Sequence, residues 1–240
     1  MPKKICAFIL PLIMMMPFAS YAEYELNKDT SDPLFILSDD DVLSETYISY
    51  GHDILRIGQG LSYGLNDRLS VGVRGHYQTD FVGDADGFSS ADLGVTYRMA
   101  RSGDNDSRMV SDLLMGFRFG GSSHVRTPWF ANSSYYAGLR FGRQFAGMSV
   151  AATIKSTWIF NETRGMSYID FIPESYFRLD PNWRAGAGFT FRKSTNLEYD
   201  QEWLDLKMVC EFGRTQYIGH FNYEFEKEEA QIGAKINILF

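Results

Sequence analysis

Apolar and polar residues alternate along most of the chain, and the clearest case is its last segment. There, Ile232, Ala234, Ile236, Ile238 and Phe240 alternate with Gln231, Gly233, Lys235 and Asn237. A period of two places successive side chains on opposite faces of a β-strand. The pattern occurs in residues 43–51, 55–63, 69–79, 91–99, 109–120, 134–144, 148–160, 169–179, 183–192, 204–212, 217–226 and 230–240. These segments predict twelve strands, of which 43–51 is the weakest, and ten strands is the alternative count.

The composition limits which all-β fold these strands can form. The mean hydropathy is only −0.22, although the chain holds 19 Phe and 14 Tyr, as expected if half of each strand faces water. Only helices and closed barrels can span a bilayer, because every backbone polar group needs a partner there. No segment after the first 22 residues is apolar and long enough for such a helix. The chain is therefore predicted to be a single transmembrane antiparallel up-and-down β-barrel, and a secreted or periplasmic β-sandwich is the alternative.

Aromatic residues near the predicted strand ends favour the barrel over the sandwich. Amphipathic rings prefer the headgroup region of a bilayer, where barrels carry aromatic girdles. The residues in question are Trp158, Phe160, Trp183, Phe212, Tyr217 and Phe240.

The closing segment resembles the last strand of bacterial outer-membrane β-barrel proteins. It has one apolar face, one polar face and a terminal Phe240. The resemblance implies that Ile236, Ile238 and Phe240 help the outer-membrane assembly machinery to recognise the chain. It also implies a Gram-negative outer membrane as the location, reached by export through the periplasm, with lipid and lipopolysaccharide as contacts.

The N-terminal region has the features of a secretory signal peptide. Lys3 and Lys4 precede an apolar stretch, 6–19, and Ala22 ends a small-residue cleavage site. The stretch is shorter than the roughly 20 residues of a transmembrane helix. We therefore predict a signal peptide at 1–22, a polar periplasmic lead-in at 23–42 and the barrel at 43–240.

The connections between the predicted strands support this orientation. Those expected on the periplasmic side are mostly short, and those expected outside are mostly longer, as in outer-membrane barrels. The residues 100–107 form a long exception on the periplasmic side. Pro173 falls inside a predicted strand, where we expect a bulge or a local break because Pro donates no ladder hydrogen bond.

Charged residues recur on the polar face of the strands, which a barrel turns toward its lumen, because charge against lipid is costly. Two interpretations remain open: a packed lumen closed by ion pairs, or basic and acidic ladders across a narrow pore. The predicted lumen charge ladder consists of Arg74, Arg98, Arg118, Arg140, Arg192, Lys207, Asp92, Asp112, Glu174, Glu211 and Glu224.

Other chemistry is sparse in this sequence. His52 with Asp53 could activate water at the barrel rim with Asp80, Asp84 or Asp86, but solvated loop residues explain them equally well. No motif indicates a cofactor, a nucleotide site or a complete metal site. The pI near 5.1 argues against nucleic-acid binding.

Two adjacent segments narrow the resemblance. Residues 63–73, YGLNDRLSVGV, and 86–98, DGFSSADLGVTYR, resemble a hairpin and strand of a transporter family named for the MetA pathway of phenol degradation. This resemblance implies a barrel that transports small, hydrophobic molecules and transfers no binding residues.

Three hypotheses of function follow. The favoured one is a narrow passive channel or transporter for an unknown small-molecule solute. The first alternative is a structural or surface-interaction barrel whose lumen is closed by ion pairs and whose loops 80–90 and 121–133 face outward. The second alternative is a rim hydrolase that uses His52; on balance, the sequence favours a protein that is not an enzyme.

Overall fold

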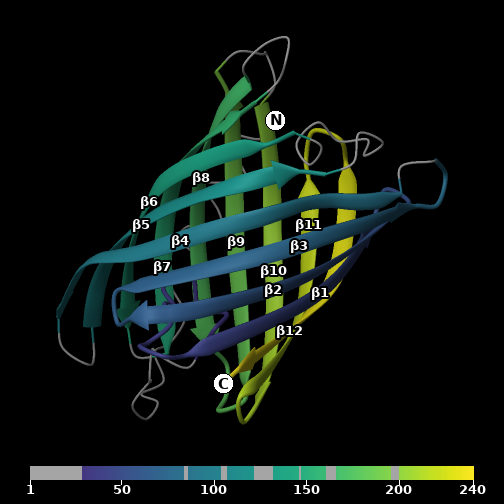
Figure 1. Cartoon of the computed structure of the whole chain (residues 1–240). Coiled ribbons are helices and arrows are strands. Elements are labelled where there is room, and N and C mark those ends of the chain that lie inside the picture. The colour runs from purple at the N-terminus through teal and green to yellow at the C-terminus, as the bar shows by residue number, and fades with distance from the viewer. Residues whose placement is uncertain are drawn as a thin grey trace.

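The computed structural model describes residues 29–83, 86–103, 107–121, 132–145, 147–160, 166–195 and 200–240. It is a closed barrel of twelve antiparallel strands, in which each strand pairs with its neighbours in sequence and β1 pairs with β12 (Figure 1). The strands are β1 (Val42–Gly51), β2 (Ile54–Asn66), β3 (Leu69–Asp80), β4 (Gly87–Gly103), β5 (Ser107–Gly120), β6 (Ser134–Phe145), β7 (Met148–Ile159), β8 (Met166–Arg178), β9 (Trp183–Ser194), β10 (Asp200–Phe212), β11 (Thr215–Glu224) and β12 (Glu229–Leu239). The predicted fold class and strand count are confirmed. Closure pairs every strand on both sides and leaves no sheet edge.

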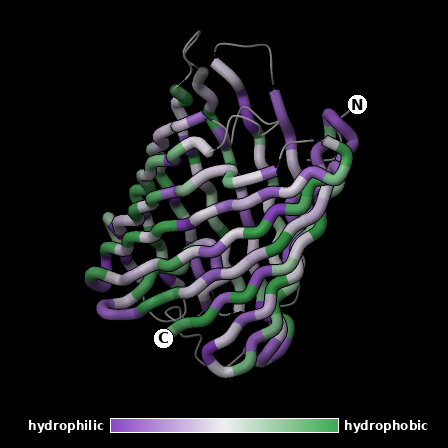
Figure 2. The backbone as a smooth tube through the Cα atoms, turned by 45° about the vertical axis from the view of Figure 1, so that its right-hand side comes forward, coloured by the Kyte–Doolittle hydropathy of each residue, from purple (hydrophilic) through white to green (hydrophobic). Residues whose placement is uncertain are grey.

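The predicted faces of the strands are confirmed as well. Large apolar side chains from all around the barrel point outward and are exposed, including Ile57 at 45%, Val73 at 55%, Ile154 at 53% and Ile232 at 58%. Apolar and polar residues alternate along the strands in Figure 2. An outer face of this kind suits contact with lipid. No helix in the described part of the chain is long and apolar enough to cross a membrane.

The strand bounds differ from the predicted ones in two informative places. The segment predicted as 91–99 is β4, which runs from Gly87 to Gly103, and β5 already begins at Ser107. The predicted long link 100–107 is therefore wrong, because strand pairing between Gly103 and Arg108 continues far beyond the apolar stretch. Polar residues near the end of a barrel can extend a hairpin without an alternating apolar signal.

Pro173 causes a local break on one side of β8. Pro173 keeps its register with Ala152 of β7, but the ladder to β9 omits Ile172 and Pro173. The register on either side of this gap is unchanged, so there is no bulge.

We call the end of the barrel that holds Val42 and Phe240 the terminus end, and the opposite end the loop end. The amide of Phe240 donates a 2.8 Å hydrogen bond to the carbonyl of Val42 at the terminus end.

Residues 29–38, which precede β1, lie inside the barrel near the terminus end (Figure 1). Asp29, Asp32 and Leu34 are between 0% and 4% exposed. We call 29–38 the inner segment. It forms part of the predicted lead-in at 23–42, whereas the predicted signal peptide at 1–22 lies outside the described residues.

Candidate functional site: the charged lumen

The inner wall holds carboxylates that are each shared by two cations. Asp112 of β5 is fully buried and accepts hydrogen bonds of 2.8 and 3.2 Å from Arg98 of β4. It also accepts bonds of 2.9 and 2.6 Å from Arg140 of β6. One carboxylate therefore neutralises only one of two guanidinium charges, and the group keeps one positive charge in excess.

Asp170 of β8 is shared in the same way. It accepts bonds of 2.7 and 3.1 Å from Arg192 of β9 and lies 3.5 Å from Nζ of Lys155 on β7. The Arg192 guanidinium also lies over the rings of Tyr168 and Trp203, 3.7 and 4.8 Å from their centroids. These aromatic faces hold the cation by a cation–π interaction and fix its orientation.

Glu45 of β1 forms the third shared group. It accepts a 2.5 Å hydrogen bond from Arg74 of β3 and contacts the ammonium group of Lys235 on β12. Arg74 reaches Glu45 across Gly60 of β2, where an added Cβ would lie 3.3 Å from both side chains. The Glu45, Asp112 and Asp170 groups thus hold two cations each for one carboxylate.

Asp92 of β4 has a different set of partners. Arg118 of β5 donates to its two oxygens at 2.6 and 3.1 Å, and Nε2 of His76 lies 2.8 Å from Oδ2. The hydroxyl of Tyr47 contacts Nδ1 of the same imidazole. This chain joins β1, β3, β4 and β5, and cross-links the wall.

At least one member of each shared group borders an open cavity in the lumen with a volume of about 480 Å³: Glu45 with Arg74, Arg140 beside Asp112, and Lys155 beside Asp170. Its wall comes from β1 to β8 and is both polar and charged. The charged lining residues are Glu45, Arg74, Asp92, Arg118, Arg140, Lys155 and Glu174. Four cations thus line the cavity against three carboxylates.

The remaining predicted lumen residues have separate roles in the structure. Glu174 lines the cavity and makes no ion pair within 4.0 Å among the described residues. Glu211 lies 3.1 Å from Arg184, and Glu224 accepts a 2.7 Å bond from Gln201 near the loop end. Lys207 donates a 2.7 Å bond to the carbonyl of Ser31 in the inner segment, rather than lining the cavity.

These contacts bear on both interpretations of the lumen. Ion pairs between neighbouring strands are what a closed, cross-linked lumen requires. A cavity bordered by excess cations is what a charge-selective channel requires. The ladder's role in selectivity remains a prediction.

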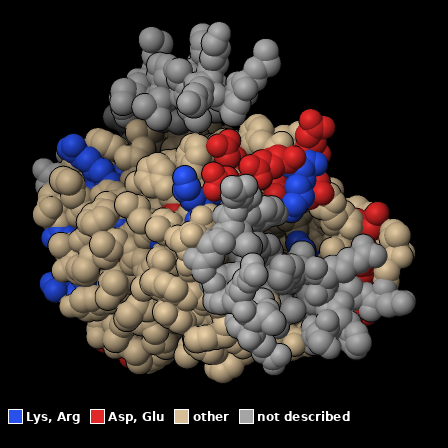
Figure 3. All heavy atoms as spheres, turned by 90° about the horizontal axis from the view of Figure 1, so that it is seen from above, with Lys and Arg blue, Asp and Glu red and all other residues tan. Residues whose placement is uncertain are grey.

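The loop end carries an acidic patch over β10 to β12 (Figure 3). Glu226 lies in the turn between β11 and β12, not within a strand, close to Asp200, Glu202 and Glu224. Partial desolvation, and then the charge of these three carboxylates, raises the pKa of Glu226.

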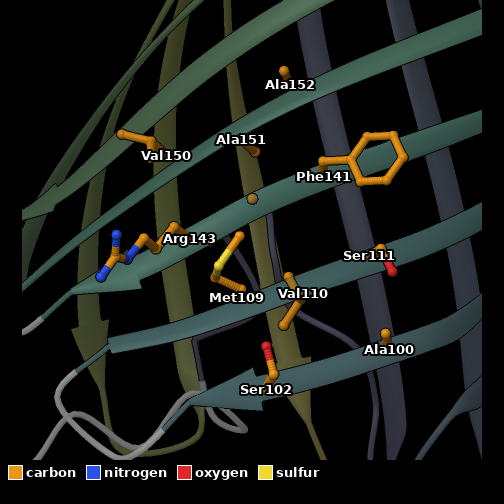
Figure 4. A pocket seen from close by; sticks show the side chains of 11 residues that line it. Ala100, Ser102, Met109, Val110, Ser111, Phe141, Arg143, Val150, Ala151 and Ala152 are labelled. Atoms are coloured by element: carbon orange, nitrogen blue, oxygen red, sulfur yellow. The ribbon is translucent and has the colours of Figure 1, made fainter.

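A second cavity, of about 600 Å³, lies on the outside of the barrel (Figure 4). Its lining includes the small residues Ala100 and Ser102 of β4 and the larger Met109, Phe141 and Arg143 of β5 and β6. Met109 and Phe141 are 58% and 49% exposed on the apolar outer face. This groove therefore faces lipid and is not part of the lumen.

The rim residues considered for catalysis serve local structure. His52 contacts Glu229 and, like Asp53, has a positive φ in the tight turn between β1 and β2. Asp80 accepts the amides of Val82 and Gly83 and so caps its own loop. Asp86 accepts the amide of Asp80 in the same way. Asp84 lies outside the described residues.

No group of three or more His, Cys, Asp or Glu side chains in the described ranges is arranged to hold a metal ion.

Sequence reasoning missed the residues that hold the inner segment, above all Asp29, Tyr176 and Gln216. The Tyr176 hydroxyl and Gln216 Nε2 each donate a 2.9 Å bond to Asp29. Tyr176 falls on the inward face of the predicted strand 169–179, whereas Gln216 lies one residue before the predicted strand 217–226 and inside the observed β11. The alternation carries no sign that a preceding segment enters the barrel.

Comparison with known proteins shows the fold and leaves the family open. No family model and no curated protein matches the chain. Among solved structures it is similar to the NanC porin, with a TM-score of 0.62 and 8% identity, and to the KdgM porin, with a TM-score of 0.60 and 9% identity. Each match covers 82% of this chain and 98% of the porin chain. A KdgM porin in complex with disordered oligogalacturonate matches equally well. The resemblance to the MetA-pathway family is not supported by these comparisons and stays a prediction. The fold of this chain is that of the outer-membrane β-barrel porins.

Proposed function

We propose that the protein is an outer-membrane channel that conducts small anionic solutes through its charged lumen. The observation that carries the proposal is the sharing of Glu45, Asp112 and Asp170 by two cations each. Each group holds excess positive charge beside the lumen. In a narrow pore, a ring of fixed charge favours the passage of ions of the opposite sign.

The size of the barrel supports a narrow channel. Twelve strands lie between the filled barrels of about eight strands and the open porins of about sixteen. The cavity of about 480 Å³ has room for a small solute. One of the similar structures is described as a KdgM porin in complex with oligogalacturonate, a polyanion. A charged lining favours such solutes over the hydrophobic molecules that the MetA-pathway resemblance implies.

The proposal places the terminus end in the periplasm and the loop end outside the cell. The apolar outer face would contact lipid and, in the outer leaflet, lipopolysaccharide. The exposed Phe240, with Ile236 and Ile238, would be available to the assembly machinery.

The reversal potential in a KCl gradient tests the proposal. We expect the refolded protein in a planar bilayer to conduct chloride more readily than potassium. Arg140→Gln combined with Lys155→Gln should lower this preference or reverse it, because the cavity is left with two cations against three carboxylates. Each substitution leaves its carboxylate one cation, since Asp112 keeps Arg98 and Asp170 keeps Arg192.

Lys193→Gln is the matched control. Lys193 is the cross-strand partner of Ile169, which faces outward, so Lys193 also lies on the outer face and should not affect selectivity. A cation-selective wild type, or a double variant with unchanged selectivity, would contradict the proposal.

The alternative of a closed, structural barrel is favoured by one observation. The inner segment crosses the lumen, and ion pairs tie neighbouring strands together. In that case, the refolded barrel would give no conductance in any of the variants, including those below that release the inner segment.

A further inference from the structure

One end of the inner segment is held by a carboxylate site in the wall. Oδ2 of Asp29 lies 2.6 Å from Nε of Arg184 on β9. Oδ1 of Asp29 accepts 2.9 Å hydrogen bonds from Tyr176 on β8 and Gln216 on β11. Three donors from three strands thus converge on one carboxylate that is 2% exposed.

The next residues make polar contacts with further strands. Lys207 of β10 donates to the carbonyl of Ser31 at 2.7 Å, and Asn237 of β12 donates to Oγ1 of Thr30 at 2.8 Å. These contacts fix the segment against the β8–β12 side of the barrel.

The segment then crosses to the opposite side of the bore. Asp32 accepts a 2.5 Å hydrogen bond from Ser149 of β7. Leu34 is fully buried and packs against Val110 of β5 and Ala151 of β7, and its carbonyl accepts a 2.6 Å bond from Arg98 of β4. A segment that touches β8–β12 at one end and β4–β7 at the other spans the lumen.

The wall is shaped to receive this segment. A Cβ added at Gly142 of β6 would lie 2.3 Å from Cδ2 of Leu34, and one at Gly64 of β2 would lie 1.8 Å from the carbonyl oxygen of Ser38. Real Cβ atoms do not approach other atoms this closely. Glycine at position 142 also leaves room for the carbonyl oxygen of Val150 on β7, 2.7 Å from the added Cβ, so it serves the barrel wall as well as the segment.

Beyond residue 38 the chain is anchored to the wall. The amide of Asp40 donates to the carbonyl of Gly64 at 3.1 Å, and the amide of Gly64 donates to the carbonyl of Asp41 at 2.9 Å. Asp40 adopts a positive φ of 63° at this point. The turn at 38–41 is held in place by these bonds, whereas the inner segment before it belongs to no strand ladder. The segment can therefore rotate about this turn.

We propose that the inner segment is a plug that closes the terminus end of the lumen and swings about the turn at 38–41 to open it. The proposal rests on the channel function above. Side-chain contacts and the buried Leu34, Ile36 and Leu37 hold the plug, and no strand ladder does, so it opens at lower cost than any strand of the barrel.

Single-channel conductance of the full-length mature protein tests the plug. The variant with Asp29→Ala, Asp32→Ala and Leu34→Gly loses the contacts on both sides of the bore. We expect it to give larger or more frequent conductance steps than the wild type. Asp67→Ala is the matched control, because Asp67 is an exposed acid in the turn between β2 and β3 at the same end of the barrel and should leave conductance unchanged. Equal conductance of the wild type and the triple variant would overturn the plug.

A disulfide lock tests the movement directly. Asp32→Cys and Ser149→Cys, combined with Cys210→Ser, place two thiols where a hydrogen bond now joins the plug to β7. The oxidised variant should stay closed and should open on reduction, whereas Ser149→Cys with Cys210→Ser should not respond. High conductance with the disulfide formed would overturn the proposal.

The outcomes separate the plug from the channel. A folded triple variant that gives no conductance would dismiss the channel itself. A wild type that conducts as well as the triple variant would keep the channel and dismiss the plug. A heat-dependent shift in gel mobility would verify that each variant is folded.

Discussion

At the scale of single residues, the buried carboxylates determine how the wall holds together. Asp112 is 0% exposed and is bonded to Arg98 and Arg140. A buried carboxylate without its cations, or cations without their carboxylate, would be strongly unfavourable. Because two arginines share one carboxylate, loss of the carboxylate should destabilise the barrel more than loss of either arginine.

Asp112→Ala should destabilise the barrel by about 3–5 kcal/mol, because two guanidinium groups lose the carboxylate they share. Arg140→Gln should cost clearly less, since Arg98 still pairs with Asp112. Urea-induced unfolding in lipid, followed by tryptophan fluorescence, measures both.

Asp205→Asn is the control for this comparison, because Asp205 makes no ion pair within 4.0 Å in the described ranges. An Asp112→Ala variant as stable as this control would show that the shared pairing contributes little.

Alternation along the sequence predicts which of these residues point inward, but not how they pair. Arg98 and Asp112 face one another because of the register in which β4 and β5 pair. The alternation does not fix this register, because a shift by two residues keeps every side chain on the same face. Tyr47 reaches His76 only because Gly58 stands between them, where an added Cβ would lie 1.9 Å from the Tyr47 ring. Such contacts depend on three strands at once.

At the scale of elements, the turns and connections carry the properties that the strands do not. The turn between β11 and β12 places Glu226 beside Asp200, Glu202 and Glu224. If the barrel is the proposed channel, this patch opposes the entry of anions from the loop end at neutral pH. The raised pKa of Glu226 means that it takes up a proton at a higher pH than an ordinary Glu.

Anion selectivity should therefore increase as the pH on the loop side falls from about 7 to about 5. The increase should be smaller in Glu226→Gln, which lacks the carboxylate whose pKa is raised. The reversal potential at a series of pH values measures this, with the pH of the opposite side held constant. Selectivity that is independent of pH would show that the acidic patch does not control entry.

The inner segment is the element that the sequence conceals. Residues 29–38 contain one short apolar run, 34–37, and acids lie on both sides of it, so the stretch has neither the period of a strand nor the length of a helix. The prediction of a polar lead-in passed over this run, which is the one local sign of a buried segment. Their position depends on donors in Tyr176, Arg184 and Gln216, which lie far away in the sequence. No local pattern can indicate contacts of this kind.

At the scale of the whole molecule, the architecture follows closely from the sequence. A period of two along twelve segments is enough to predict a closed barrel and its two surfaces. Even the weak segment 43–51 forms β1, because closure requires a partner for both β2 and β12. The state of the lumen could not be predicted, since it depends on the plug and on pairing across strands.

The central claim is that the lumen conducts small anions, and solute flux into proteoliposomes tests it most directly. Glucuronate, glucose and glucosamine are similar in size and carry negative, zero and positive charge. Both the wild type and the triple plug variant should be measured. The account predicts the fastest flux for glucuronate and the slowest for glucosamine, with higher rates in the plug variant. Equal rates for the three solutes, the reverse order, or no flux through the folded plug variant would contradict it.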